Sequence, residues 1–292
     1  MIPIDFTGKV ALVTGVGDND SFAWYISKAL KAAGAKIVLA CHPRVLGIVE
    51  SFLTRDMDAE SRRLPDGSEL KVEKLYPCDA RFDSMAEVDE ATRNDKRWNK
   101  YPFYAIKEVV DAVGKEFGGI DILVHSIAFS REIKNRMLDT SRSAYYEALG
   151  ISAYSLTSLL RAAEPYMENR PGGASAVGLT YLGGSRVVPH YGGGMSTAKA
   201  ALQIDAAQLA YNLGKKDIRV NLISAGPYAS RAAKGIGDIQ ASIDYAAARS
   251  PLPRGITPEE VANATAFLCS PLASGITGHT LFVDCGYHVM GG

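Results

Sequence analysis

The chain has 292 residues, a length at which α/β proteins often still form a single domain. Hydrophobic residues make up 47% and charged residues 22%, which is typical of a globular protein and argues against disorder and against a membrane-spanning chain. The 32 basic and 32 acidic residues cancel, so no overall field attracts nucleic acid.

Short apolar runs alternate with segments of helical periodicity along the chain. Strands are predicted at 10–14, 37–41, 71–76, 120–125, 174–180, 219–223 and 280–283. Helices are predicted at 22–33, 104–117, 142–167, 195–213, 239–249 and 258–268. Apolar strands joined through helices imply parallel pairing with helices on both faces. We therefore expect a Rossmann-type α/β fold, a doubly wound parallel sheet of about seven strands, as one domain over 1–292.

Two polar segments, near 54–68 and 92–103, interrupt this alternation. The second contains a basic run with Trp98 and Tyr101 interleaved. We interpret both segments as surface insertions. A nucleic-acid-binding stripe is the alternative for the second segment, although an aromatic-studded charge run is a weak signal on its own.

A glycine turn with Gly15 and Gly17 joins the first strand to the first helix. Such a turn lets the backbone approach a pyrophosphate, whose charge is stabilised by the free amides at the helix N-terminus. The third glycine of the usual dinucleotide motif is absent, and Ser21 and Ala23 stand near its place. A plain strand–helix turn therefore stays open as an alternative.

Other strand ends carry residues that suit a dinucleotide. Asp79 follows the third strand, where it could accept a hydrogen bond from an adenine amino group or serve as a cap. Ser126 follows the fourth strand and leaves room for a ribose, whereas His125 before it is better explained as a core residue. Ligands of open α/β sheets bind beyond the carboxyl ends of the strands. After the second strand no acidic residue is placed to hold a ribose diol, and Arg44 could bind a 2′-phosphate, so NADPH is not excluded.

Tyr181, Tyr191 and Lys199 follow the fifth strand in a glycine-rich setting. A tyrosine can donate a hydrogen bond to a developing oxyanion, while a nearby lysine stabilises that charge and can hold a cofactor ribose. These residues predict a nicotinamide-dependent reductase.

The four cysteines, at 41, 78, 269 and 285, form no Cys-x-x-Cys pair. We expect reduced thiols and no metal site. The N-terminus leads into the first strand with no basic leader and no long apolar segment, which favours a cytoplasmic protein.

Together these motifs resemble the enoyl-[acyl-carrier-protein] reductases, a branch of the short-chain dehydrogenase/reductase superfamily. The resemblance runs nearly end to end and includes the Ile223-Ser-Ala-Gly-Pro227 and Phe282-Val-Asp-Cys-Gly286 segments. The longer segments before Asp79 and after Arg93 resemble the extended form of plastids and some bacteria.

The position of the tyrosine distinguishes this family from its relatives. In the wider superfamily the catalytic tyrosine stands four residues before the lysine, where this chain has Met195. Enoyl reductases have it further upstream, usually with six residues between; here seven residues separate Tyr191 from Lys199, as in the extended form. The alternatives are a 3-ketoacyl or carbonyl reductase, and a non-catalytic NAD(P)-binding protein.

The resemblance implies reduction of the trans-2 double bond of enoyl-acyl-carrier-protein thioesters by NADH, the last step of type II fatty acid elongation. It implies that Tyr191 hydrogen-bonds the enolate oxygen, Lys199 holds the nicotinamide ribose and Tyr181 lines the acyl pocket. Substrate contacts are implied for Ser130, Tyr181 and Tyr191. Cofactor contacts are implied for Gly15, Ser21, Phe22, His42, Asp79, Ala80, Ser126, Ile127, Lys199, Gly226, Pro227, Tyr228, Ser230 and Ala232.

The expected partners are acyl carrier protein bearing the enoyl group and further copies of the chain in a homotetramer. Neither nucleic acid nor a membrane is expected. The small-residue segment near 230–250 is interpreted as a flap over the substrate, with a surface helix as the alternative.

Overall fold

The computed structural model describes residues 4–230 and 238–291. Seven parallel strands form one sheet in the order β3-β2-β1-β4-β5-β6-β7, which confirms the predicted fold class. The strands are β1 (Val10–Thr14), β2 (Lys36–Cys41), β3 (Val72–Pro77), β4 (Ile122–His125), β5 (Ala174–Thr180), β6 (Ile218–Ala225) and β7 (Thr280–Val283).

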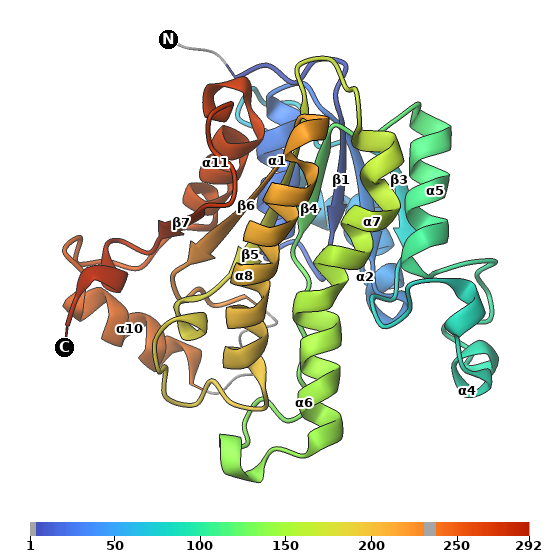
Figure 1. Cartoon of the computed structure of the whole chain (residues 1–292). Coiled ribbons are helices and arrows are strands. Elements are labelled where there is room, and N and C mark those ends of the chain that lie inside the picture. Colours follow the sequence, from blue (N-terminus) through green and yellow to red (C-terminus); the bar gives the residue numbers. More distant parts are fainter. Residues whose placement is uncertain (1–3, 231–237, 292) are drawn as a thin grey trace.

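Helices cover both faces of the sheet (Figure 1). One layer contains α1 (Phe22–Ala32), α2 (Pro43–Thr54) and α11 (Pro258–Cys269), and the other contains α5 (Ile106–Phe117), α7 (Ser155–Met167) and α8 (Met195–Leu213). A hydrophobic core lies between the sheet and each helix layer, and successive strand residues point alternately into the two cores. Val13 packs against the first layer and Leu12 against the second. The shorter or peripheral helices are α3 (Ala59–Arg62), α4 (Glu90–Asn94), α6 (Arg142–Leu149) and α10 (Ile239–Arg249).

The predicted helix 142–167 is two helices joined by a turn of π-helix, Gly150–Tyr154. A π turn holds one residue more than an α turn and thus rotates everything that follows. Here it directs Ser152 to the main chain of Phe129, whose N–H donates to the hydroxyl at 2.9 Å. The periodicity of the sequence carries no mark of this change.

Helix α2 was missed by the sequence interpretation, which placed no helix after the second strand. His42 is its N-cap, with Nδ1 accepting from the Arg44 amide at 3.2 Å, and Pro43 opens the first turn. Leu46, Val49 and Phe52 then form its buried side.

The two segments predicted as surface insertions are largely exposed, but each is held by a buried side chain. In the first, the Arg62 guanidinium donates to the carbonyls of Phe52 and Arg55. In the second, Trp98 is only 2% exposed, and its indole N–H reaches Asp79. Because Trp98 lies inside the molecule, it is not available to stack on a nucleic-acid base, and the alternative keeps only the half-buried Tyr101.

Candidate active site

Tyr181, Tyr191 and Lys199 come together at the carboxyl end of β5. Tyr181 directly follows the strand, and its ring packs against that of Tyr191 with centroids 5.0 Å apart and planes inclined by 68°. Lys199, in the second turn of α8, is buried and donates from Nζ to the Leu179 carbonyl in β5 at 2.7 Å. The structure thus brings the three predicted catalytic residues to one strand end.

The glycines before α8 fit the chain around this group. A Cβ on Gly192 would lie 1.8 Å from the Asn135 carbonyl oxygen. Gly193 has φ +59° and would place a Cβ 2.4 Å from the Glu132 backbone. Ser130, predicted to contact substrate, donates its hydroxyl to the Gly193 carbonyl at 2.7 Å. Ser130 therefore holds the Tyr191 loop in place, and its contact with substrate stays a prediction.

The electrostatics of the group follow from burial. Burial, with smaller contributions from Tyr287 and Asp284, raises the pKa of Tyr181 to about 12. Burial and the neighbouring Tyr181 raise the pKa of Tyr191 as well. Burial lowers the pKa of Lys199 to about 8. At neutral pH the two phenols are hydrogen-bond donors beside a lysine that is mostly charged.

Met195 occupies the place four residues before Lys199. It is buried at the start of α8, and the Ser152 hydroxyl lies 3.5 Å from its sulfur. A thioether there supplies no acidic proton, so Tyr181 and Tyr191 are the phenols that this loop offers.

The turn between β1 and α1 is shaped by a close crossing of two chain segments. Gly15 has φ +81°, and a Cβ there would lie 2.1 Å from the Ser126 carbonyl oxygen. Around Gly17 a Cβ would meet nothing within 4 Å, so this side of the turn is open. Ser21 caps α1 by accepting from the Trp24 amide at 3.4 Å. An open glycine turn at a helix N-terminus fits a phosphate group.

The segment after β6 lies against this turn. The Tyr228 hydroxyl donates to Asp20 at 3.0 Å, and its ring packs on Phe22 with centroids 5.1 Å apart. Gly226 and Pro227 lead into Tyr228, and the amide of Ser230 donates to the Tyr228 carbonyl at 2.8 Å. Ala232 lies outside the described residues, as does the 231–237 part of the predicted flap; within the described part of 230–250 is the helix α10.

The ends of β2 and β3 carry a compact cluster of His42, Asp79, Arg81 and Trp98. Asp79 accepts from Arg81 Nη2 at 2.7 Å and from the Trp98 indole at 3.0 Å, and His42 Nε2 lies 3.6 Å from it. Burial acts to raise the pKa of Asp79, but the bonds from Arg81 and the charges of His42 and Arg81 hold it below its usual value. Burial lowers the pKa of His42, and the charge of Asp79 opposes this shift.

Arg81 and Trp98 are the residues of this cluster that the sequence interpretation did not assign to the site. The sequence features that could have indicated them are the position of Arg81, two residues after Asp79, and the presence of Trp98 as a single tryptophan within a polar segment. The Asp79 carboxylate already accepts hydrogen bonds from these two side chains. The hydrogen bond expected from adenine to Asp79 stays a prediction.

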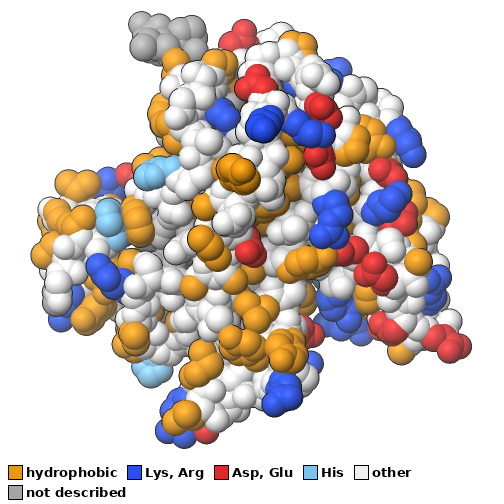
Figure 2. Space-filling view, viewed as in Figure 1, with side chains coloured by type: hydrophobic (Ala, Val, Ile, Leu, Met, Phe, Trp, Pro, Cys, Tyr) orange, Lys and Arg blue, Asp and Glu red, His pale blue; other side chains and the backbone are white. Residues whose placement is uncertain are grey.

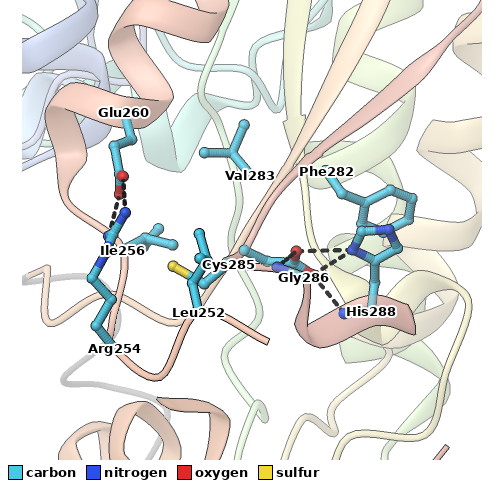
Figure 3. A pocket seen from close by; sticks show the side chains of 10 residues that line it. Leu252, Arg254, Ile256, Glu260, Phe282, Val283, Cys285, Gly286 and His288 are labelled. Carbon is cyan, nitrogen blue, oxygen red and sulfur yellow. Dashed lines mark hydrogen bonds and ion pairs between the residues drawn. The ribbon is translucent and has the colours of Figure 1, made fainter. Parts of the chain in front are cut away.

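A surface hollow lies at the carboxyl end of β7 (Figure 3). On one side, Arg254 pairs with Glu260 at 2.6 Å. On the other, His288 stacks on Phe282 with centroids 4.0 Å apart and shares hydrogen bonds with Asp284. The polar side chains of this hollow are thus paired with one another. The hollow is linked to the Tyr181 site electrostatically, because Asp284 contributes to the raised pKa of Tyr181.

Comparison with known proteins agrees with this geometry. The family profile described as "Enoyl-(Acyl carrier protein) reductase" matches residues 103–288. The chain is 48% identical over 291 residues to "Enoyl-[acyl-carrier-protein] reductase [NADH] 2, chloroplastic" of Oryza sativa, covering 99% of this chain and 78% of the rice protein. It is 37% identical over 290 residues to the NADH enoyl-[acyl-carrier-protein] reductase FabI of a Nostoc strain, with 99% of each chain covered.

Solved structures give the same result. The enoyl-acyl-carrier-protein reductase of Plasmodium berghei, determined with triclosan, matches with a TM-score of 0.92 at 39% identity, covering 97% of this chain and 99% of the other. The Anaplasma phagocytophilum enzyme, solved in complex with NAD, matches with a TM-score of 0.79 at 35% identity, covering 99% and 97%. From its sequence, its fold and the residues gathered at its strand ends, the chain belongs to the enoyl-[acyl-carrier-protein] reductase family.

Proposed function

We propose that this protein reduces the trans-2 double bond of enoyl-acyl-carrier-protein thioesters with NADH, in fatty acid biosynthesis. The observation that carries the proposal is the pair of packed phenols, Tyr181 and Tyr191, beside a buried Lys199, with Met195 where a ketoacyl reductase would have its tyrosine. The relatives described above are named for this reaction and for NADH.

The strand ends fit a dinucleotide. Gly15 permits the close crossing with Ser126, and the open side at Gly17 adjoins the N-terminus of α1, where free amides stabilise a pyrophosphate. Tyr228 packs over Phe22 at the same turn. When bound, NADH supplies the hydride that is added to the β-carbon of the substrate. We assign the cofactor-contacting residues named from the sequence to this surface, Ala232 excepted because it is outside the described residues.

The protein's own groups would then act on the thioester. Tyr191, protonated because its pKa is raised, donates a hydrogen bond to the oxygen that becomes negative as the double bond is reduced. Lys199 holds the ribose hydroxyls and adds positive charge next to that oxygen. Tyr181 lines the acyl pocket and offers a second donor, and Ser130 keeps the Tyr191 loop in register.

The test is NADH oxidation with crotonyl-CoA and with an enoyl-acyl-carrier-protein thioester, run beside a 3-ketoacyl thioester and beside NADPH. We expect turnover of the enoyl substrates with NADH. Turnover of the ketoacyl substrate alone would mean that the Tyr191 assignment is wrong. NADH binding without turnover of either substrate would favour the non-catalytic alternative.

We also propose a homotetramer. Figure 2 shows apolar side chains over α8 and the lower end of α6. The exposed apolar residues of α8 include Ile204, 60% exposed, and Tyr211, 82% exposed. Exposed apolar side chains that gather on one face are typical of an interaction site. Sedimentation equilibrium of the wild type and of a Tyr211→Lys variant tests the proposal: a monomeric wild type would contradict it.

The cysteines support a reducing compartment such as the cytoplasm. All four are free thiols, and burial raises the pKa of Cys78 and of Cys269 to about 12, so neither forms a reactive thiolate near neutral pH. Among the described helices, none has the length and apolar character that crossing a membrane requires. Fractionation of the native cells tests the location.

A further inference from the structure

His125 is a buried titratable residue to which the mechanism above gives no role. It is the last residue of β4, its side chain is fully buried, and it points to the face of the sheet that α7 and α8 cover. In the part of the chain that the structure describes, its Nδ1 atom has no hydrogen-bond partner. A buried acceptor or donor without a partner is rare in proteins and calls for an explanation.

The hydrogen bonds around Ser155 determine which nitrogen of His125 carries the proton. The Ser155 hydroxyl lies 2.6 Å from the Ile151 carbonyl oxygen and 2.7 Å from His125 Nε2. A carbonyl oxygen can only accept, so the single hydroxyl proton must point to Ile151. Nε2 must therefore be the donor to Ser155. The ring is held as the Nε2–H tautomer, and Nδ1 is left with a lone pair.

That lone pair lies next to the segment of β5 that Lys199 contacts. His125 is paired in register with Gly178, and Nδ1 lies 3.8 Å from the place that a Cβ of Gly178 would occupy. The carbonyl of the next residue, Leu179, accepts the hydrogen bond from Lys199 Nζ. Burial, and then the positive charge of Lys199, lower the pKa of His125 to about 3. The ring is thus neutral at every working pH, and its Nδ1 can act as an acceptor.

We propose that His125 is a positioning residue for Lys199: its imidazole, held as the Nε2–H tautomer by Ser155, offers Nδ1 to a buried water that is hydrogen-bonded to the Lys199 ammonium. Buried waters typically satisfy polar groups that lack a protein partner. The Lys199 ammonium has three donors, of which the Leu179 carbonyl takes one. A water between Nδ1 and Nζ uses the second and leaves the third for the cofactor ribose. The inference rests on the proposed role of Lys199.

The π turn makes this arrangement possible. Ile151 lies within Gly150–Tyr154, and Ser155 begins α7. The extra residue of the π turn therefore determines the positions of the Ile151 carbonyl and the Ser155 hydroxyl, which together orient the imidazole. Apart from Lys199, no charged side chain in the described ranges contributes to the lowered pKa of His125, and the pKa of Lys199 is lowered by burial alone. The charge of Lys199 therefore acts on His125, whereas burial sets the lowered pKa of Lys199.

Nuclear magnetic resonance of ¹⁵N-labelled histidine in the wild-type protein tests the tautomer without any turnover. We expect His125 to show a protonated Nε2 and an unprotonated Nδ1 between pH 6 and 9 (a range of ordinary assay conditions). A protonated Nδ1 would overturn the proposal. This reading is independent of whether the protein reduces enoyl thioesters.

The coupling to Lys199 is tested by the alkaline limb of the pH profile of kcat/KM. His125→Phe removes the acceptor but keeps a ring, and loss of one hydrogen bond to a charged group should move the limb down by about one pH unit. His125→Asn restores an acceptor near Nδ1 and should return the limb toward the wild-type position. Ser155→Ala should move it in the same direction as His125→Phe.

Ser158→Ala is the matched control, because Ser158 is also buried on α7 but donates to Asp83 at 2.6 Å. An unmoved limb in His125→Phe, or an equal movement in Ser158→Ala, would overturn the coupling. Should His125→Phe not fold, Ser155→Ala and His125→Asn give the same decision. NADH binding measured against pH provides the limb even without enoyl turnover, so failure of the proposed function is distinguished from failure of this inference.

Discussion

Replacing Tyr191 with phenylalanine removes one hydroxyl and leaves the ring that packs on Tyr181 at 5.0 Å. Fold and loop should therefore survive. Burial keeps this phenol protonated, so the variant loses a donor in a site from which water is largely excluded. Removal of one such donor typically costs about 3 to 4 kcal/mol in the transition state, which corresponds to a loss of about 100- to 1,000-fold in kcat.

Steady-state kinetics with an enoyl thioester, together with fluorescence titration of NADH, measures this effect. We expect the dissociation constant of NADH to change by less than about threefold, since the hydroxyl is proposed to meet the substrate and not the cofactor. Tyr181→Phe is the matched control and should lose about tenfold or less. A larger loss in Tyr181→Phe than in Tyr191→Phe, or an equal weakening of NADH binding in Tyr191→Phe, would refute the assignment of roles.

Three further outcomes are expected. Activity of the wild type should fall as pH rises through about 8, because the Lys199 pKa is lowered to that value and its charge is lost above it. Lys199→Ala should weaken both turnover and NADH binding and should abolish this alkaline fall in activity, which pH-rate profiles would show. Gly15→Ala should lower the melting temperature and weaken NADH binding more than tenfold (about 1.4 kcal/mol or more), because the new Cβ would lie 2.1 Å from a carbonyl oxygen. In the control Gly17→Ala the new Cβ would meet nothing within 4 Å, so the melting temperature should be nearly unchanged. Trp98→Phe should lower the free energy of unfolding by about 1 to 2 kcal/mol in urea titrations, because the buried Asp79 loses one of its donors; an unchanged value would mean that the indole bond contributes nothing to stability.

The sequence predicted all seven strands, with ends displaced by a residue or two. Five of them, β1, β2, β4, β5 and β6, are short apolar runs that are almost wholly buried, whereas the edge strands β3 and β7 are more exposed. Helix α2 was missed for a local reason. Its N-cap is His42, which is not among the usual capping residues, and His42-Pro43-Arg44 was interpreted only for what it could bind.

The site was predicted in part. Tyr181, Tyr191 and Lys199 could be grouped because they follow one strand within a short stretch of chain. The bond between Trp98 and Asp79, and the one between His125 and Ser155, could not be predicted, since each joins separate elements. The π turn that aims Ser155 has no signature in the periodicity of residues 142–167.

The crossing of Gly15 and Ser126 has a consequence for how the protein folds. The two residues directly follow strands β1 and β4, which are adjacent in the sheet but separated in the chain by two other strands and the helices between them. The glycine turn that we propose for the pyrophosphate therefore takes its final shape only after this long-range pairing is complete. Ligand bound only by the native state adds about 2.7 kcal/mol of stability at a hundred times its dissociation constant. NADH should accordingly slow unfolding of the central sheet, and its binding during refolding should report the moment when β1 and β4 meet.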